Sequence, residues 1–418
     1  MLFKKELKES PLNQWEKKSI MLVIPPKNDN EFIKGIYNRV KKIKGLSIIE
    51  TKPIEVNKPG LLIVKYENEE YIIEINVNKF TLPDTYISKK YYFKEEEINK
   101  IRSIDKALVI TMKYKNNPKK EYYLQLKIAI TMIPDLLGII DDSKESFLPF
   151  RWIKMTTDTD IEVSANDLYN VHMVYEKNDV WLHTHGLARC GLTELEILNS
   201  NKENCTNHYH LLNTYANYLI DNKEKKDKTN SAYIGVLIDR TPIVVTSLIW
   251  TKALKYYKKL KLGNAKDRVS SHNTKTSIIF LYKSEEDEKN NILSKINEYD
   301  KLWGENPIFF VSSEETKRMK SLAQERFNYV INKFKEKKKV LIKIGLPVKE
   351  EFGNFEHIWF ELLEVKGEKF KALLTQEPYN VENMHEGDTG WYTVNDVTDW
   401  MIFEKNITIN PNNVYILE

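Results

Sequence analysis

The segment YNVHMVYEKNDVWLHTHG, residues 169–186, holds two runs of apolar and β-branched residues on either side of the polar tetrapeptide EKND. Residues 169–175 and 180–185 each have the length and composition of a β-strand. Residues 176–179 have the composition of a turn. The segment therefore predicts an antiparallel pair of strands in the middle of the chain.

The same kind of pattern recurs on both sides of this segment. Residues 61–66 and 71–77 alternate as strands around the turn residues 67–69, and residues 95–104 have the spacing of a helix. Because helices and antiparallel pairs are mixed, the predicted fold class is α+β, with two or three mixed domains, largely antiparallel sheets and a small β-rich C-terminal module. A chain of 418 residues exceeds one ordinary core. The expected domains are 1–115 (N-terminal α+β), 116–311 (central α+β) and 312–418 (helix plus the β-rich module).

Four further segments carry explicit structural expectations. Residues 31–43 have the apolar spacing of one amphipathic helix, and residues 121–140 that of a long helix kinked at Pro134. Residues 150–155 have the composition of a strand. A helix is expected to begin at residue 312, where Ser312 and Glu315 form a capping box.

Composition limits the classes of function. Acidic residues nearly balance basic ones, for a net charge of +4, and only eight of the basic residues are Arg. Phosphate and base recognition favour Arg and a basic surface, so no nucleic-acid partner is expected. The sequence predicts no signal peptide, no membrane-spanning segment and, with two cysteines, no disulfide framework. A cytoplasmic protein is the expectation.

Four short motifs near the C-terminus carry the most specific resemblance to a known family. They are EHIWFE at 356–361, LLTQEP at 373–378, MHEGD at 384–388 and DVTDWM at 396–401. In this order they resemble the YegJ-like bacterial domain of unknown function. The segment WLHTHGL at 181–187, with ELE at 194–196, resembles larger uncharacterised bacterial proteins that end in such a domain. The resemblance implies a small α+β or barrel-like module and brings no catalytic residues with it.

Six of the ten histidines and cysteines lie within residues 183–210, where an even distribution would place fewer than one. Imidazole and thiolate bind zinc well. On a strand His183 and His185 project from the same face, and Thr193 and Glu196 follow them. This spacing is similar to that of the JAMM metalloproteases, which implies His183, His185 and Glu196 as metal ligands and Thr193 as a brace for the oxyanion or bound water.

The match to the JAMM pattern is incomplete. Gly186, Thr193 and Glu196 stand where the pattern has Pro, Ser and Asp, and the upstream base could be Glu145, Glu162 or Glu176. Two alternatives stay open. One is a structural zinc site made of Cys190, Cys205, His208 and His210. The other treats all these residues as ordinary core and turn residues, an interpretation that also applies to His172 and His272.

These observations lead to two functional hypotheses. The first is a bacterial cytoplasmic protein that has no cofactor and no catalytic activity and binds another protein, in an immunity-like or stress-linked role. It follows from the missing active-site signature and from the aromatic residues of the C-terminal module. The alternative is a zinc-dependent hydrolase of peptide or isopeptide bonds, with His183 and His185 at its metal site. Neither hypothesis includes a membrane partner.

Overall fold

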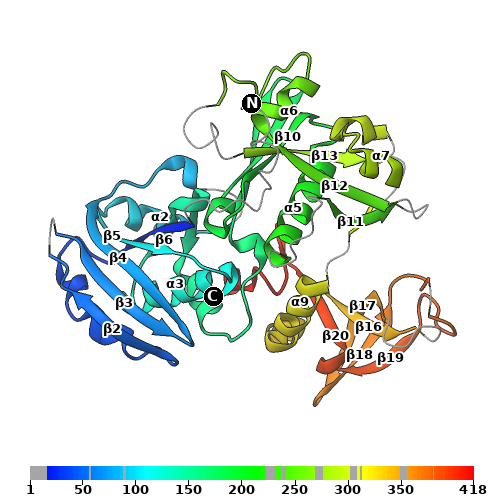
Figure 1. Cartoon of the computed structure of the whole chain (residues 1–418). Coiled ribbons are helices and arrows are strands. Elements are labelled where there is room, and N and C mark those ends of the chain that lie inside the picture. Colours follow the sequence, from blue (N-terminus) through cyan, green and yellow to red (C-terminus); the bar gives the residue numbers. More distant parts are fainter. Residues whose placement is uncertain are drawn as a thin grey trace. The chain divides into compact units, whose positions relative to one another are not determined.

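A computed structural model confirms the α+β class, the largely antiparallel sheets and the β-rich C-terminal module. The chain divides into two compact units (Figure 1). Unit 1 comprises Met1–Thr157 and Val163–Val311, and unit 2 comprises Asp158–Glu162 and Ser312–Glu418. The structure describes residues 17–55, 58–87, 91–222, 231–237, 242–268, 276–301, 308–310, 313–348, 355–379 and 381–418. The predicted cap at Ser312 and the residue His272 lie outside these ranges.

The first sheet of unit 1 is antiparallel throughout, in the order β2-β3-β4-β5-β1-β6-β7. Helix α3 (Pro118–Met132) packs against this sheet. Its buried Gln125 donates hydrogen bonds to the carbonyls of Ser19 and Ile110, both at 3.2 Å. The short helices are α1 (Ile36–Val40) and α2 (Glu95–Arg102). The strands are β1 (Lys18–Ile24), β2 (Leu46–Lys52), β3 (Gly60–Tyr66), β4 (Glu69–Lys79), β5 (Lys106–Lys113), β6 (Gly138–Asp141) and β7 (Ser146–Pro149).

Three expected elements of this region are wrong. The predicted strand at 150–155 is helix α4 (Phe150–Thr157), whose buried Trp152, Ile153 and Thr157 have helical spacing. The helix expected over 121–140 ends at Met132, because Pro134 cannot continue the ladder of hydrogen bonds, and residues 138–141 form β6 instead. The helix expected over 31–43 is broken into a 3-10 turn and α1 by Gly35, which has a φ of 67°.

The second sheet of unit 1 has the order β15-β11-β12-β13-β10-β9-β8, and β14 pairs with β13. Only β10 and β13 run parallel among the described pairs. Helix α5 (Cys205–Asp221) covers one face, where Tyr215 contacts Ser247, and α6 (Trp250–Ala253) packs near Trp181 and Phe280. Helix α7 spans Glu285–Asn290. The strands are β8 (Asn170–Glu176), β9 (Asp179–His185), β10 (Glu194–Asn201), β11 (Ala232–Leu237), β12 (Pro242–Ile249), β13 (Thr276–Tyr282), β14 (Ser294–Lys295) and β15 (Ile308–Phe310).

The predicted hairpin in the middle of the chain is confirmed. Strands β8 and β9 pair from Glu176 and Asp179 outward, around a turn in which Lys177 has a φ of 55°. Positive φ matches the twist of a tight hairpin turn. Counting from this turn, His172 lies directly opposite His183. The hairpin therefore fixes the relative position of two histidines that are eleven residues apart in the sequence.

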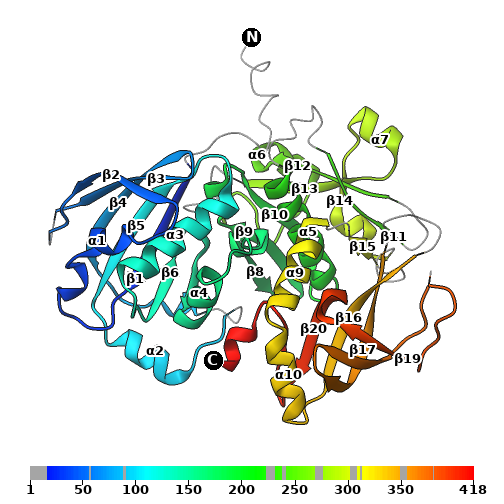
Figure 2. The same ribbon diagram turned by 90° about the horizontal axis from the view of Figure 1, so that it is seen from below.

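Unit 2 is an antiparallel sheet in the order β19-β18-β17-β16-β20-β21, with α9 (Ser313–Glu325) and α10 (Phe327–Lys335) against it (Figure 2). The buried indole of Trp400 donates a hydrogen bond of 3.0 Å to the carbonyl of Ala323, which ties the sheet to α9. The expected division into the domains 1–115, 116–311 and 312–418 remains a prediction. The strands are β16 (Val340–Pro347), β17 (Phe355–Lys366), β18 (Lys369–Leu374), β19 (Thr389–Thr393), β20 (Val397–Phe403) and β21 (Thr408–Ile409).

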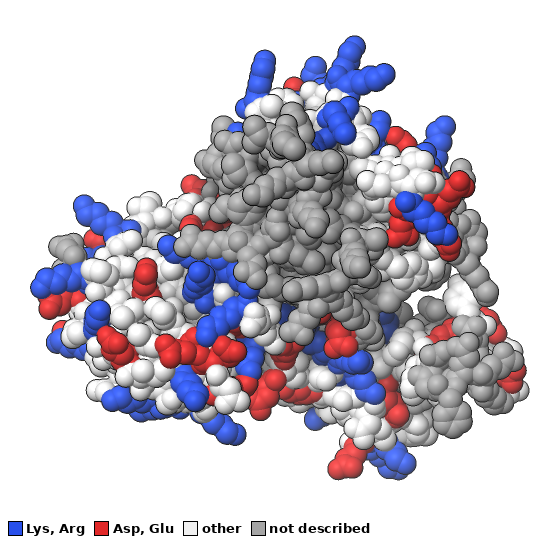
Figure 3. All heavy atoms as spheres, viewed as in Figure 1, with Lys and Arg blue, Asp and Glu red and all other residues white. Residues whose placement is uncertain are grey.

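On the face shown in Figure 3, charged side chains of both signs are interspersed among the described residues. This mixture follows from the near balance of basic and acidic residues in the sequence. Among the described residues, no helix has both the length and the apolar character needed to cross a membrane.

Candidate metal centre

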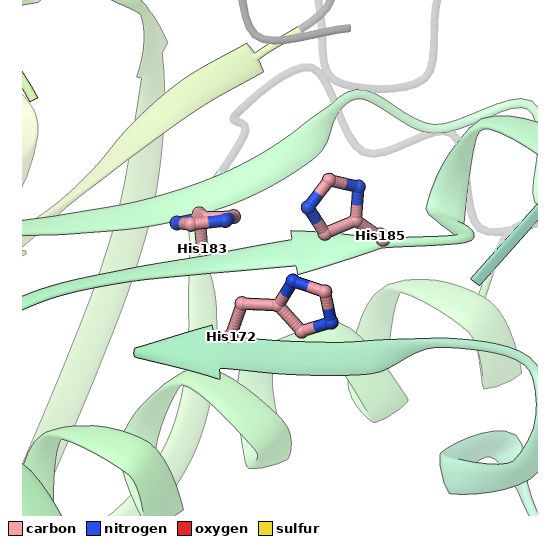
Figure 4. Close-up of side chains that lie close together, drawn as sticks. All are labelled: His172, His183 and His185. Atoms are coloured by element: carbon pink, nitrogen blue, oxygen red, sulfur yellow. The ribbon is translucent and has the colours of Figure 1, made fainter. Parts of the chain in front are cut away.

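Three histidines meet on one face of the second sheet. His183 and His185 are alternate residues of β9 and so project from the same face, and His172 of β8 is the cross-strand neighbour of His183. Figure 4 shows the three rings turned toward one shared space. We call His172, His183 and His185 the histidine cluster. It is built on paired strands, and such elements hold side chains more firmly than loops do.

The nitrogens of the cluster are close enough to share one ion. One ring nitrogen from each residue lies within 4.8 Å of the other two, and no other such group of His, Cys, Asp or Glu occurs among the residues that the structure describes. Ring centroids are 4.5 Å apart for His172 and His185 and 5.1 Å apart for His183 and His185. His183 and His185 are buried, whereas the side chain of His172 is 30% exposed. The cluster is therefore accessible from its His172 side.

A carboxylate faces the cluster from the first sheet. Glu145 ends the 3-10 turn η3 (Asp142–Lys144), and its oxygens lie 3.4 Å from Nδ1 of His185 and 3.6 Å from Nδ1 of His172. Burial, together with the carboxylates of Asp142 and Glu194, raises the pKa of Glu145 above its ordinary value. Glu145, one of the three acidic residues considered as an upstream base, therefore contacts two of the three histidines.

The turn after β9 is held by a second carboxylate. Glu194 is buried and accepts hydrogen bonds from the hydroxyl of Thr184 and from the backbone N–H groups of Gly186 and Ala188. Burial raises the pKa of Glu194, and these three bonds offset part of that rise. Gly186 has a φ of 115°, and a Cβ there would lie 2.5 Å from the carbonyl oxygen of Leu168, so only glycine fits. This turn fixes the end of the strand that carries His185.

The predicted third ligand, Glu196, has a different partner. It is the cross-strand neighbour of His183 on β10, but Arg268 donates to both of its carboxylate oxygens, at 2.7 and 2.6 Å. Both side chains are fully buried, and the indole of Trp181 donates to the same carboxylate. The hydroxyl of Thr193 donates to Ser277 at 3.0 Å. The group that the structure brings together is thus His172, His183 and His185, without Glu196 or Thr193.

The remaining residues of the histidine-rich window do not form a ligand group in the described part of the chain. Cys190 is buried in the turn η5 (Leu187–Cys190), and the thiol of Cys205 donates to the carbonyl of Lys202. His208 is buried, with Nδ1 2.7 Å from Ser200 and Nε2 2.7 Å from Asp300. His210 is exposed on α5. The structural-zinc alternative therefore has no assembled site here.

Comparison with known proteins gives three family matches. The model described as "Protein of unknown function (DUF4026) N-terminal" matches residues 19–162, and "Protein of unknown function (DUF4026) C-terminal" matches residues 171–280. The model "Uncharacterized protein conserved in bacteria (DUF2314)" matches residues 314–416. The chain is a bacterial protein built from domains of unknown function. No curated protein and no solved structure matches it.

These matches confirm the predicted kind of family and add one fact about the site. The C-terminal segment belongs to a bacterial domain of unknown function, as its motifs indicated, while the finer name YegJ-like stays a prediction. Glu145 lies in the N-terminal match, whereas His172, His183 and His185 lie in the C-terminal one. The site is therefore assembled from both family segments of unit 1.

Proposed function

We propose that the histidine cluster binds one divalent transition-metal ion, zinc first of all, and that the protein is a metal-dependent hydrolase. The observation that carries the proposal is the convergence of three imidazole nitrogens within 4.8 Å on two paired strands. Zinc–nitrogen bonds of about 2.0–2.1 Å in a tetrahedral site require nitrogens about 3.3 Å apart, which small side-chain rotations achieve. Three protein ligands and one open position are typical of catalytic zinc.

Glu145 is the proposed proton acceptor. A metal ion lowers the pKa of a bound water, and a nearby carboxylate then takes the proton as the water attacks a carbonyl carbon. Glu145 faces His172 and His185 at 3.6 and 3.4 Å from the more exposed side of the cluster. Its raised pKa brings it closer to the range in which a carboxylate both accepts and returns a proton. The resemblance of the sequence spacing to the JAMM metalloproteases implies a peptide or isopeptide bond as the substrate.

The first experiment measures metal in protein purified without a His-tag. We expect about one zinc ion per chain, as in other single catalytic sites. The double variant His183→Ala/His185→Ala should lose this ion while keeping the far-ultraviolet circular dichroism of the wild type. The matched control is His210→Ala, an exposed histidine of the same sequence window that lies outside the cluster. Wild-type protein that neither contains nor takes up zinc on titration would refute the metal site.

The second experiment tests the role of Glu145. Glu145→Gln should retain zinc but lose roughly 10²–10⁴-fold in the hydrolysis of quenched fluorescent peptides. If Glu145 were instead a fourth ligand of a closed structural site, the same variant would bind zinc less tightly and the wild type would not hydrolyse any of the peptides. Zinc content and turnover together therefore separate an enzyme from a structural site.

A second candidate function concerns unit 2 and does not depend on the metal. In the described part of the chain β19 forms one end of the sheet, with Trp391 46% exposed on it, and Tyr379 is 89% exposed nearby in sequence. An open strand edge with exposed aromatic side chains can bind an extended segment of another protein. If unit 2 acts in this way, a protein captured by the full chain in stoichiometric amount should be lost in Trp391→Glu and retained in His210→Ala. Equal capture by the wild type, Trp391→Glu and His210→Ala would contradict this candidate function.

A further inference from the structure

Next to Glu145 in the sequence lies a lysine that is fully buried. The ammonium of Lys144 donates to the carbonyl of Asp167 at 2.6 Å and to the hydroxyl of Tyr91 at 3.0 Å. It lies 5.2, 5.3 and 5.8 Å from the ring centroids of Tyr91, Tyr122 and Trp152. A buried charge is costly unless it is paired and hydrogen-bonded. The two hydrogen bonds and the three aromatic rings offset this cost and hold Lys144 in one place. We call Tyr91, Tyr122 and Trp152 the aromatic cage.

The cage belongs to a larger buried charge network, which consists of Asp141, Lys144 and Arg189. Arg189 is fully buried, donates to both oxygens of Asp141 at 3.0 and 2.9 Å, and also donates to the carbonyl of Leu168. Lys144 lies 3.9 Å from the same carboxylate. The network thus links three segments of the chain: the one that carries Glu145, the one that leads into His172, and the turn that follows His185.

The packing around Gly186 and the backbone conformation of Glu145 support the same link between these segments. A Cβ built on Gly186, the residue after His185, would lie 3.0 Å from Cβ of Lys144. Glu145 itself has φ 52° and ψ 49°, a left-handed conformation that residues other than glycine rarely adopt. Such a conformation persists where the surroundings hold it, and it is found often at functional sites. Lys144, anchored one residue earlier, is the group that can hold it.

We infer that Lys144 is the positioning residue that fixes the carboxylate of Glu145 against the histidine cluster. This inference rests on the proposed function, because Lys144 has this role only if the cluster binds a metal ion and Glu145 faces the open position of that ion. Asp141 and Arg189 support this role, because Asp141 lies 3.9 Å from Lys144 and Arg189 donates both to Asp141 and to the carbonyl of Leu168, in the segment that leads to His172. The network joins the two family segments at the place where the site needs residues from both.

The test uses cobalt(II) in place of zinc and azide as a ligand for the open position. Azide binding is followed in the visible spectrum of the cobalt-loaded full chain. The negative charge of Glu145 beside the open position opposes azide, so Glu145→Gln should tighten azide binding by roughly ten-fold. Lys144→Met, which keeps the length of the side chain but releases Glu145, should tighten it in the same direction. In the double variant Lys144→Met/Glu145→Gln no further tightening should occur.

The sign of the effect separates positioning from the mere loss of a charge. Removing a positive charge by itself weakens the binding of an anion, whereas release of Glu145 strengthens it. Lys127→Met is the matched control, because Lys127 also donates from a partly buried ammonium to a backbone carbonyl, that of Thr157, but is not part of the network. Tyr91→Phe is the milder variant if Lys144→Met does not fold, and it should shift azide binding less, in the same direction.

Each outcome has one meaning. Protein that takes up no cobalt refutes the proposed function. Cobalt-loaded protein in which Glu145→Gln tightens azide binding, while Lys144→Met and Tyr91→Phe leave it unchanged or weaken it, keeps the metal site and overturns the positioning role. Equal azide binding in wild type and Glu145→Gln shows that Glu145 does not face the open position, which also overturns the inference.

Discussion

Two groups of polar side chains lie on neighbouring strands of the second sheet, and they differ in what they can bind. Glu196 and Arg268 form a closed pair: opposite charges at 2.6 Å, both fully buried, with a further hydrogen bond from Trp181 to Glu196 and another from Arg268 to Thr276. The histidine cluster, one strand away, brings three groups of the same kind together around a shared space. His208, with Ser200 on one nitrogen and Asp300 on the other, is closed like the first group.

The difference shows why residue type and spacing alone do not identify a site. A carboxylate that receives two hydrogen bonds from a guanidinium has little left to offer a metal ion. Three convergent imidazoles do not neutralise one another, and a cation is the partner that their nitrogens suit best. Substitutions in the closed groups should therefore lower the free energy of unfolding, whereas substitutions in the cluster should weaken metal binding.

The largest effect is expected at the closed pair. Arg268→Met leaves the carboxylate of Glu196 buried without its main partner, so the free energy of unfolding should fall by about 3–5 kcal/mol. Denaturant titration measures this change, and adding Glu196→Gln should recover part of it because the buried charge is removed. Zinc per folded chain should stay at the wild-type level in the double variant. Loss of zinc there would show that Glu196 is a ligand after all, as the sequence spacing predicted.

The next effect is the loss of metal on substitution of the most exposed ligand. His172→Ala should reduce zinc affinity by more than about 100-fold, because even partners outside the coordination sphere contribute 10–100-fold. Competition with a chromophoric chelator measures the affinity. Unfolding of the metal-free variant should be close to that of the wild type, because the side chain is 30% exposed. Unchanged zinc affinity would leave His172 outside the site and contradict the cluster as defined.

His208 provides the counterpart within the same sequence window. His208→Ala leaves the buried hydroxyl of Ser200 and the carboxylate of Asp300 without their partner, at an expected cost of about 1–3 kcal/mol in the free energy of unfolding. Zinc affinity should not change. If His208→Ala kept the wild-type stability but bound zinc more weakly, the result would contradict this expectation. It would favour the structural zinc site made of Cys190, Cys205, His208 and His210.

Much of the fold follows from the sequence pattern. The hairpin at 169–185 is predictable because its alternating runs flank a polar turn, and the C-terminal strands are predictable for the same reason. Residues 150–155 mislead because the apolar residues of a short buried helix resemble those of a strand. The end of α3 before Pro134 depends on whether a proline kinks or ends a helix, which the tertiary packing decides.

Part of the site could also have been found from the sequence. Once the turn at 176–179 is predicted, counting outward from it along both strands places His172 opposite His183, although no spacing motif contains His172. Glu145 could be recognised only as one of three acidic candidates, because its approach to the cluster depends on how the two sheets of unit 1 pack. The pairing of Glu196 with Arg268, 72 residues away, carries no local signal in the sequence at all.

The smallest effect concerns a histidine of unit 2 that belongs to neither group. Burial, with the charges of Lys343 and Lys320, lowers the pKa of His357, whose Nδ1 lies 3.1 Å from the hydroxyl of Thr398. Because the folded state binds its proton less readily than the unfolded state, the stability that His357 contributes is present above its unfolded pKa of about 6.5 and is lost as the pH falls toward the folded value. Solvent screening keeps this contribution below about 1 kcal/mol. Denaturant titrations of wild type and His357→Gln from pH 7.5 to 5 should therefore converge slightly as the pH falls, in metal-free protein. A wild type that gains stability relative to the variant on acidification would show that the sign of this pKa shift is the opposite.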